Sequence, residues 1–287
     1  MTTKYIYIEA DIHSNNKWGL LQPGTLIEEV TPFGESYVEE PLLNPEQKFL
    51  LEVRNEALKG VKKIVGKNKV NYVFLGDAHQ GNKHVTQYVS QLSSAQSTIM
   101  IENFRPVFKK LNIDKSEIIF GTEAHDGMGH THIKSLVSAL RQEFQRTKLT
   151  MSHHSDISVD GFVINAAHHG ASEGSRRALR GNAMRLYLQG IMDDYEDMGN
   201  KPPDLVVRGH FHGYHWETIR RYNKEGWTKS DIILVPSLCG MGAYGRQATR
   251  SRSHIINGSL LLEIKDGNLI NIHDFIMMRD LVRKEYW

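Results

Sequence analysis

The chain of 287 residues has little of several features that would define its class. Its single cysteine, Cys239, allows no intrachain disulfide and no zinc site built from cysteines. No apolar run approaches the roughly 20 residues that span a bilayer. Residues 1–5 lack the basic and apolar segments that begin a secretory signal. We therefore expect a cytoplasmic protein that has no membrane partner.

An excess of charge is also missing, because 35 Lys and Arg face 33 Asp and Glu, for a formal net charge of +2. This balance argues against a protein that coats nucleic acid by bulk electrostatics, although local basic patches remain compatible with it. The abundant residue is histidine, with 15 copies against 11 Tyr and 10 Phe. Histidine is the commonest metal ligand and the usual proton carrier near neutral pH, so this abundance calls for a chemical explanation.

Apolar runs typical of strands buried on both faces recur along the chain, and each ends in polar, reactive residues. These runs cover residues 5–10, 70–75, 117–120, 161–167 and 204–208. Between them, helical spacing predicts helices over 45–65, 89–111, 132–144 and 176–192, the first capped by Asn44. The alternation predicts α/β layers with reactive groups at the carboxyl ends of strands.

The C-terminal part differs, since residues 231–235, 259–264 and 269–273 have the pattern of meandering strands, and 265–268 has that of a hairpin turn. Residues 14–44 are rich in Gly, Pro and Glu, which favours a long loop insertion with room for a small hairpin. No repeat or linker interrupts the pattern. We therefore expect one domain over residues 1–287.

Five reactive clusters follow the predicted strands, and their residue types suit metal binding. They are Asp11-x-His13, Gly76-Asp77, Gly121-Thr-Glu-Ala-His125-Asp126, His168-His169 and Gly209-His210-x-His212. Side chains at i and i+2 of a strand point the same way, so the first and last clusters can each present two ligands together. Mixed nitrogen and oxygen ligands suit Mn, Fe, Zn or Ni rather than calcium. One carboxylate shared by two cations can hold them roughly 3.5–4 Å apart, the spacing of two-metal hydrolytic sites.

This succession of clusters, from Asp11 to His212, closely resembles the calcineurin-like metallophosphoesterase superfamily. The loop after His13 and the block ending in His125 are similar to those of phage-encoded members, which would place the protein in the host cytoplasm. The resemblance implies an α/β fold of two facing mixed β-sheets flanked by helices, a four-layer αββα sandwich. It also implies two divalent metal ions, with manganese favoured over Fe, Zn or Ni, and hydrolysis of phosphodiesters or phosphomonoesters by a metal-bridging hydroxide.

The resemblance assigns a role to each matching residue. The first metal ion would be bound by Asp11, His13 and His212, the second by His168 and His210, and Asp77 would bridge them. His168 is preferred to His169 because the family's ligand directly follows the strand, and because adjacent strand residues face opposite sides. His169 is left to contact substrate phosphate or to support a ligand.

The third cluster departs from the family pattern, because Ala124 stands before His125 where the family has a metal-binding asparagine. Alanine cannot coordinate a metal. In one interpretation Glu123 or Thr122 takes over the coordination, and His125 keeps the family's role of giving a proton to the leaving oxygen. In the other, His125 is itself a metal ligand. We favour the first.

Further candidates could contact substrate. His79 and His84 follow Asp77 in a loop, where a solvated histidine is an equal alternative. Basic residues gather in two places, each of which could be a solvated face or a phosphate-binding site. They are Arg176, Arg177, Arg180 and Arg185 in the predicted helix 176–192, and Arg246, Arg250 and Arg252 beyond it.

A functional basic cluster would favour DNA, RNA or a nucleotide as substrate and hence a nuclease, whereas a phosphatase or cyclic-nucleotide phosphodiesterase would not need one. The alternative outside enzymes is a non-catalytic metal-binding or scaffold protein that kept the fold.

Overall fold

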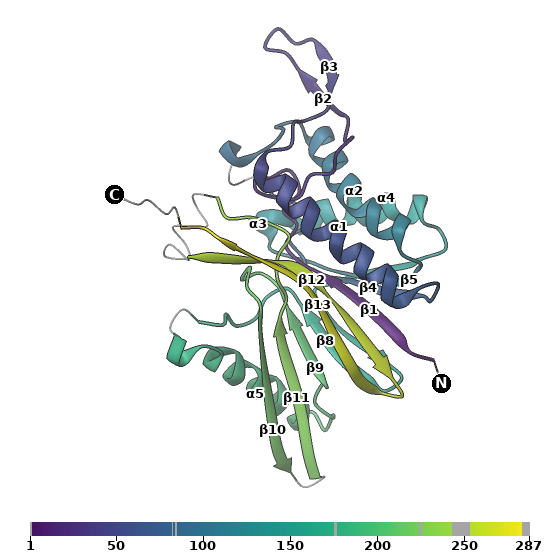
Figure 1. Ribbon diagram of the computed structural model, residues 1–287, viewed down its shortest axis with the longest axis vertical. Helices are drawn as coiled ribbons and strands as arrows, with labels where there is room; N and C mark the ends of the chain where they lie inside the picture. The colour runs from purple at the N-terminus through teal and green to yellow at the C-terminus, as the bar shows by residue number, and fades with distance from the viewer. Residues whose placement is uncertain are drawn as a thin grey trace.

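The computed structural model describes residues 2–81, 83, 85–174, 177–223, 226–242 and 253–282. Two β-sheets face each other at its centre (Figure 1). One has six strands in the order β13-β12-β1-β4-β5-β6, and the other has five in the order β10-β11-β9-β8-β7. Apolar side chains from both sheets fill the space between them, among them Ile8, Val73, Ile164, Val207 and Ile233.

The six-stranded sheet combines parallel and antiparallel pairs, since β1 runs parallel to β4 and antiparallel to β12. Its strands are β1 (Lys4–Glu9), β4 (Val70–Phe74), β5 (Ile113–Ile119), β6 (Lys148–Ser152), β12 (His254–Lys265) and β13 (Asn268–Asp280). The five-stranded sheet is mixed in the same way. Its strands are β7 (His154–Val159), β8 (Phe162–Ala167), β9 (Leu205–Arg208), β10 (His215–Asn223) and β11 (Gly226–Leu234).

Helices cover the outer face of each sheet. On the six-stranded sheet lie α1 (Pro45–Val65), α2 (Ser93–Lys110) and α4 (Thr131–Glu143), which share an apolar core with its strands. On the five-stranded sheet lies α5 (Asn182–Asp197), packed on Val206, Ile232 and Leu234. The order helix, sheet, sheet, helix confirms the predicted four-layer α/β fold. None of the helices in the described ranges is long and apolar enough to cross a membrane.

Local sequence signals placed the ends of several elements correctly. Helix α1 has the predicted bounds, because Asn44 and Gln47 form a capping box at its start. The turn between β12 and β13 has Asp266 and Gly267 at φ of 53° and 70°, the left-handed pair that a tight hairpin favours. Within residues 14–44, β2 (Ile27–Val30) and β3 (Ser36–Glu39) pair as a hairpin that projects from the body (Figure 1).

The predicted helix 176–192 was wrong at its beginning. Residues Arg177–Leu179 form a short 3-10 turn, Gly181 is left-handed at φ 81°, and α5 starts only at Asn182. Arg177 and Arg180 therefore precede the helix, and Arg185 lies in its first turn. Arg176 and the second basic group, Arg246, Arg250 and Arg252, lie outside the described residues, as does His84.

A buried ion pair joins helix α1 to the carboxyl end of strand β1. Arg54 of α1 donates from Nε and Nη2 to the two carboxylate oxygens of Glu9 at 2.8 and 2.7 Å, and both side chains are at most 1% exposed. Tyr7 and Tyr72 also donate to this carboxylate, at 2.7 and 2.8 Å. Since Glu9 is the last residue of β1, the network fixes the strand end from which the loop to Asp11 departs.

Candidate metal centre

The predicted metal ligands converge just beyond the carboxyl ends of parallel strands from the two sheets. Asp11 and His13 follow β1, Asp77 follows β4, His168 follows β8, and His210 and His212 follow β9. Five of these six residues have a left-handed backbone: Asp11 at φ 51°, His13 at 45°, Asp77 at 52°, His210 at 71° and His212 at 48°. Such conformations cost on the order of 1–3 kcal/mol each and gather at functional sites.

This backbone corrects one part of the sequence reasoning. The two D-x-H and H-x-H pairs do not lie on strands with both side chains on one face. They lie in the loops that follow, where the left-handed residues turn the side chains toward one another. The ligands meet because of loop conformation rather than strand alternation.

Asp77 lies at the centre of the cluster. Its Oδ2 is 3.2 Å from Nε2 of His168, 3.9 Å from Nε2 of His13 and 4.0 Å from Nε2 of His125. Its Oδ1 accepts hydrogen bonds from the backbone N–H of Thr122 at 2.7 Å and from its hydroxyl at 3.0 Å. One oxygen is thus held by Thr122, and the other faces the imidazoles.

Two groups of candidate ligands lie around this carboxylate. In the first, Nε2 of His13 lies 3.2 Å from Nε2 of His212, which lies 3.7 Å from Oδ1 of Asp11. In the second, Nε2 of His168 lies 3.2 Å from Nδ1 of His210. The Nδ1 of His168 contacts the Leu75 carbonyl at 2.5 Å, which leaves its Nε2 to face Asp77.

Burial and mutual repulsion keep most of these imidazoles neutral. Burial, with the charge of His168, lowers the pKa of His210 to about 4, and burial lowers that of His212 to about 3. Burial, together with His125, also lowers the pKa of His13. His168 is the exception: burial opposes its charged form, but Asp77 and Asp11 raise its pKa to about 9.

This chemistry fits metal ions. Neutral ring nitrogens only 3.2 Å apart, as in His13 and His212, need a proton or a cation between them. Asp11 and Asp77 supply buried carboxylate oxygens within the same cluster. Neutral imidazoles with carboxylates are the donor set of divalent transition metals. The residues present therefore fit such ions.

Asp126 positions the loops that carry the site, and sequence reasoning gave it no role. This buried carboxylate accepts from the N–H of Ala78 at 3.1 Å and of Gly121 at 2.5 Å, joining the loops after β4 and β5. Burial and the charge of Asp77 raise its pKa to about 8. Gly121 allows these two loops to approach each other closely, since a Cβ at this position would lie 2.2 Å from Oδ1 of Asp77. The only sequence signal for Asp126 was its position directly after His125.

The third cluster brings Thr122 and His125, but not Glu123, to the Asp77 carboxylate. His125 contacts the Gln80 carbonyl through Nδ1 at 2.8 Å, and its Nε2 faces Asp77. Glu123 accepts from the N–H of Gly129 at 3.3 Å and belongs to none of the candidate ligand groups found among the described residues. His13, Asp77 and His125 do form such a group, so the geometry accommodates both interpretations of His125.

Two neighbours of the cluster complete the arrangement. His169 is exposed, and one of its ring nitrogens lies within 4.8 Å of ligand atoms of His168 and His210. Cys239, to which the sequence gave no role, lies within 4.8 Å of ligand atoms of His13 and His212. Burial raises the pKa of its thiol well above the usual value.

The remaining candidates lie in other surroundings. His79 is fully buried against His132, with ring centroids 4.0 Å apart, and burial lowers its pKa to about 3. Arg185 pairs with Glu217 at 2.6 Å, and Arg180 contacts the Tyr214 carbonyl at 3.5 Å. Arg177 lies in the 3-10 turn before α5. Arg185 of α5 is thus paired with a carboxylate of β10, the strand on which its helix packs.

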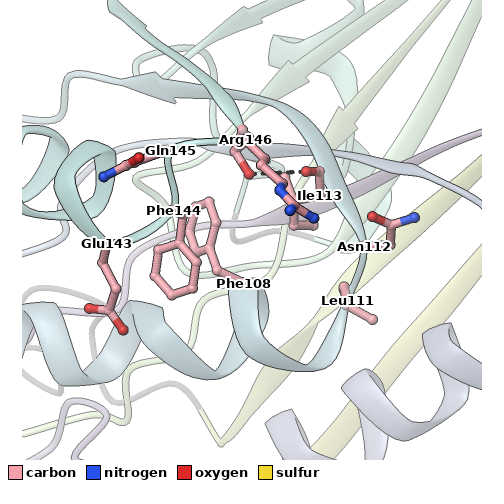
Figure 2. A pocket seen from close by; sticks show the side chains of 9 residues that line it. Phe108, Leu111, Asn112, Ile113, Glu143, Phe144, Gln145 and Arg146 are labelled. Carbon is pink, nitrogen blue, oxygen red and sulfur yellow. Dashed lines mark hydrogen bonds between the residues drawn. The ribbon is translucent and has the colours of Figure 1, made fainter.

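A cavity of about 380 Å³ lies away from these ligands. Figure 2 shows Phe108, Phe144 and Arg146 among the side chains that line it. Ile113, the first residue of β5, also borders it. Because β5 runs parallel to β4, this cavity lies at the amino ends of these strands, whereas Asp77 follows the carboxyl end of β4. It is therefore not part of the candidate metal centre.

Comparison with known proteins gives a limited result. No protein-family model matches the sequence, and no curated protein matches it. A solved protein of unknown function from Aquifex aeolicus is 14% identical over 78% of this chain and 82% of its own, with a TM-score of 0.31. A metallophosphoesterase from Sphaerobacter thermophilus is 11% identical over 95% of this chain and 88% of its own, with a TM-score of 0.36. At these values neither likeness carries weight for function.

Proposed function

We propose that the chain is a binuclear metal-dependent phosphoesterase. The observation that carries this proposal is the position of Oδ2 of Asp77 between two groups of imidazoles, that of His13 on one side and that of His168 on the other. Asp11, His13 and His212 would hold one ion, and His168 and His210 would hold the other. Asp77 would contact both, because its Oδ2 faces His13 on one side and His168 on the other.

The charge of the centre supports a phosphoester as substrate. Two divalent ions sharing a carboxylate lower the pKa of a water and neutralise charge on phosphoryl oxygens, which is the usual chemistry of such pairs. The exposed His169 at the edge of the cluster would contact those oxygens. The buried ligands would keep their relative positions, since Thr122 fixes Asp77 and the Leu75 carbonyl fixes His168.

His125 is suited to move a proton. Its Nδ1 contacts the Gln80 carbonyl, so this nitrogen carries the hydrogen of the neutral ring. The Nε2 then faces the cluster and can take up and give a second proton to the leaving oxygen. The side chain is 21% exposed, which gives the leaving group a way out to solvent.

The test is metal analysis together with hydrolysis of a chromogenic phosphodiester and a chromogenic phosphomonoester. We expect two bound ions per chain, hydrolysis that stops on chelation, and recovery with Mn²⁺ greater than with Zn²⁺ or Ni²⁺. The Asp231→Asn variant is a suitable control, since this carboxylate on β11 contacts Thr218 and Lys229 rather than the cluster. Two bound ions without hydrolysis of any phosphoester would instead favour a non-catalytic metal-binding protein.

A further inference from the structure

The β10–β11 hairpin carries exposed aromatic side chains on one of its faces. The two strands pair without a bulge from His215 opposite Leu234 to Asn223 opposite Gly226. Side chains alternate along such a pair, so Trp216, Arg220 and Tyr222 share a face with their cross-strand neighbours Trp227 and Lys229. We call these five residues the aromatic face of the hairpin.

The opposite face of the hairpin is already occupied. Ile219 and Ile232 pack on α5, and Arg221 pairs with Asp193 and Glu196 of the same helix. The aromatic face therefore turns away from α5. It begins beside Ile233, which lies in the core between the sheets.

Toward the tip of the hairpin this face is no longer covered. The exposed fraction rises from 44% at Trp216 to 72% at Tyr222 and 77% at Trp227. In Figure 1 the hairpin reaches to the lower end of the molecule. Large aromatic surfaces left open in this way mark binding sites.

The chemistry of the face matches a strand of unpaired nucleotides. The rings of Tyr222 and Trp227 lie 5.6 Å apart in a T-shaped arrangement, and both offer surface on which a base can stack. Between Trp216 and Tyr222 stands Arg220, whose exposed side chain has no ion pair or hydrogen bond with the side chains of other described residues. Lys229 lies opposite Arg220 and is half exposed, with Asp231 as its partner. Aromatic rings interleaved with cations bind single strands by stacking and by charge.

A second exposed hairpin in the chain has the opposite chemistry. Between residues 18 and 47 there are six glutamates and no lysine or arginine. Phe33, at the tip of the β2–β3 hairpin, is 93% exposed among them. This hairpin would repel phosphates, so Phe33 is a matched control for an exposed aromatic residue without neighbouring cations.

We propose that the aromatic face of the hairpin binds single-stranded nucleic acid and leads it to the candidate metal centre. Strand β10 begins three residues after His212 and extends roughly 27 Å to its tip, so one bound strand of nucleic acid can contact both places. The substrate class would then be the phosphodiesters of single-stranded DNA or RNA. This assignment of substrate rests on the proposed phosphoesterase function, whereas the binding surface itself does not.

The experiment measures binding in the presence of EDTA, so that hydrolysis plays no part. Fluorescein-labelled oligothymidylate and oligouridylate are titrated with the full chain, and anisotropy reports the bound fraction. We expect binding that weakens with salt, and roughly tenfold weaker binding for Tyr222→Ala and for Trp227→Ala. Arg220→Ala should reduce the salt dependence, and Phe33→Ala should leave the affinity unchanged. The oligothymidylate and oligouridylate arms decide between DNA and RNA.

Three results would overturn the proposal. One is an unchanged affinity in the Tyr222→Ala/Trp227→Ala double variant. Another is equally tight binding of inorganic polyphosphate, which has charge but no bases. The third is a wild-type dimer that dissociates on Trp227→Ala without any oligonucleotide binding, since the face would then be covered by a second copy.

Hydrolysis of the chromogenic phosphodiester separates this proposal from the proposed function. If Trp227→Ala keeps that hydrolysis but loses oligonucleotide cleavage, both proposals are supported. If the wild-type protein hydrolyses the small ester and binds no oligonucleotide, only the nucleic-acid surface fails. If it binds oligonucleotide through the aromatic face and hydrolyses nothing, only the phosphoesterase function fails.

Discussion

Replacing Asp77 with asparagine removes one negative charge from the middle of the candidate centre and keeps the shape of the side chain. Its effect can be worked from His168, whose Nε2 lies 3.2 Å away. Burial alone would lower the pKa of His168, yet Asp77 and Asp11 raise it from 6.5 to about 9. That rise corresponds to roughly 3 kcal/mol of net interaction, a lower bound on what the two carboxylates contribute.

Without the charge of Asp77, burial should dominate and the pKa of His168 should fall well below 9. The folded-state pKa in the wild type lies above the unfolded value of 6.5. The stabilisation is therefore complete below pH 6.5 and is lost as the pH rises through about 9. We expect the loss of the proton from His168 to lower the free energy of unfolding of the metal-free wild type by about 3 kcal/mol between about pH 6.5 and pH 9. The Asp77→Asn variant should lose much less over the same window.

The same substitution should impair metal binding and turnover. A neutral amide cannot bridge two cations, so the variant should retain at most one ion per chain. Loss of several kcal/mol of transition-state stabilisation predicts turnover lower by about 10³-fold or more.

The assays are NMR titration of the imidazoles in chelated protein, urea unfolding at several pH values between about 6 and 10, elemental analysis and phosphodiester hydrolysis. Asp231→Asn serves as the control and should leave the His168 titration unchanged. The reasoning is refuted if an imidazole still titrates near 9 in Asp77→Asn, or if two ions and full turnover remain.

Three further substitutions separate the roles of neighbouring groups. His125→Gln should lower turnover by roughly 10²–10⁴-fold with metal content unchanged, and loss of an ion would show instead that His125 is a ligand. Thr122→Val keeps the backbone donor to Asp77 but removes the hydroxyl, so metal affinity measured by equilibrium dialysis should fall roughly 10–100-fold, and an unchanged affinity would contradict the positioning role. Arg54→Met leaves Glu9 buried without its partner, so the free energy of unfolding measured in urea should fall by about 3–5 kcal/mol. Adding Glu9→Gln to this variant should restore part of that free energy. A loss below about 1 kcal/mol would refute the importance of this ion pair.

The sequence predicted much of the fold because its signals are local. Helix α1 begins at Pro45 because Asn44 and Gln47 cap it, and all of these residues lie within one turn. The turn between β12 and β13 was predictable because Asp266 and Gly267 suit the left-handed conformation that it needs. The beginning of α5 was not, since the 3-10 turn and Gly181 interrupt a segment whose apolar spacing alone favours helix.

The roles around the centre were harder to predict, because they depend on contacts between distant segments. Thr122 acts through the two hydrogen bonds that it donates to Asp77. Asp126 joins two loops through backbone donors, which carry no residue-specific signal in the sequence. Cys239 follows β11 in another part of the chain and reaches His13 and His212 only in the folded protein.

The sequence by itself determined the reactive residue types and their places after apolar strands, because burial and alternation are encoded in neighbouring residues. Only the tertiary structure decided which oxygen of Asp77 faces the imidazoles, which nitrogen of His168 faces that oxygen, and where Glu123 points. The physical reason is that β1 and β4 belong to one sheet, and β8 and β9 to the other. The ligands meet only when the shared apolar core packs the two sheets face to face.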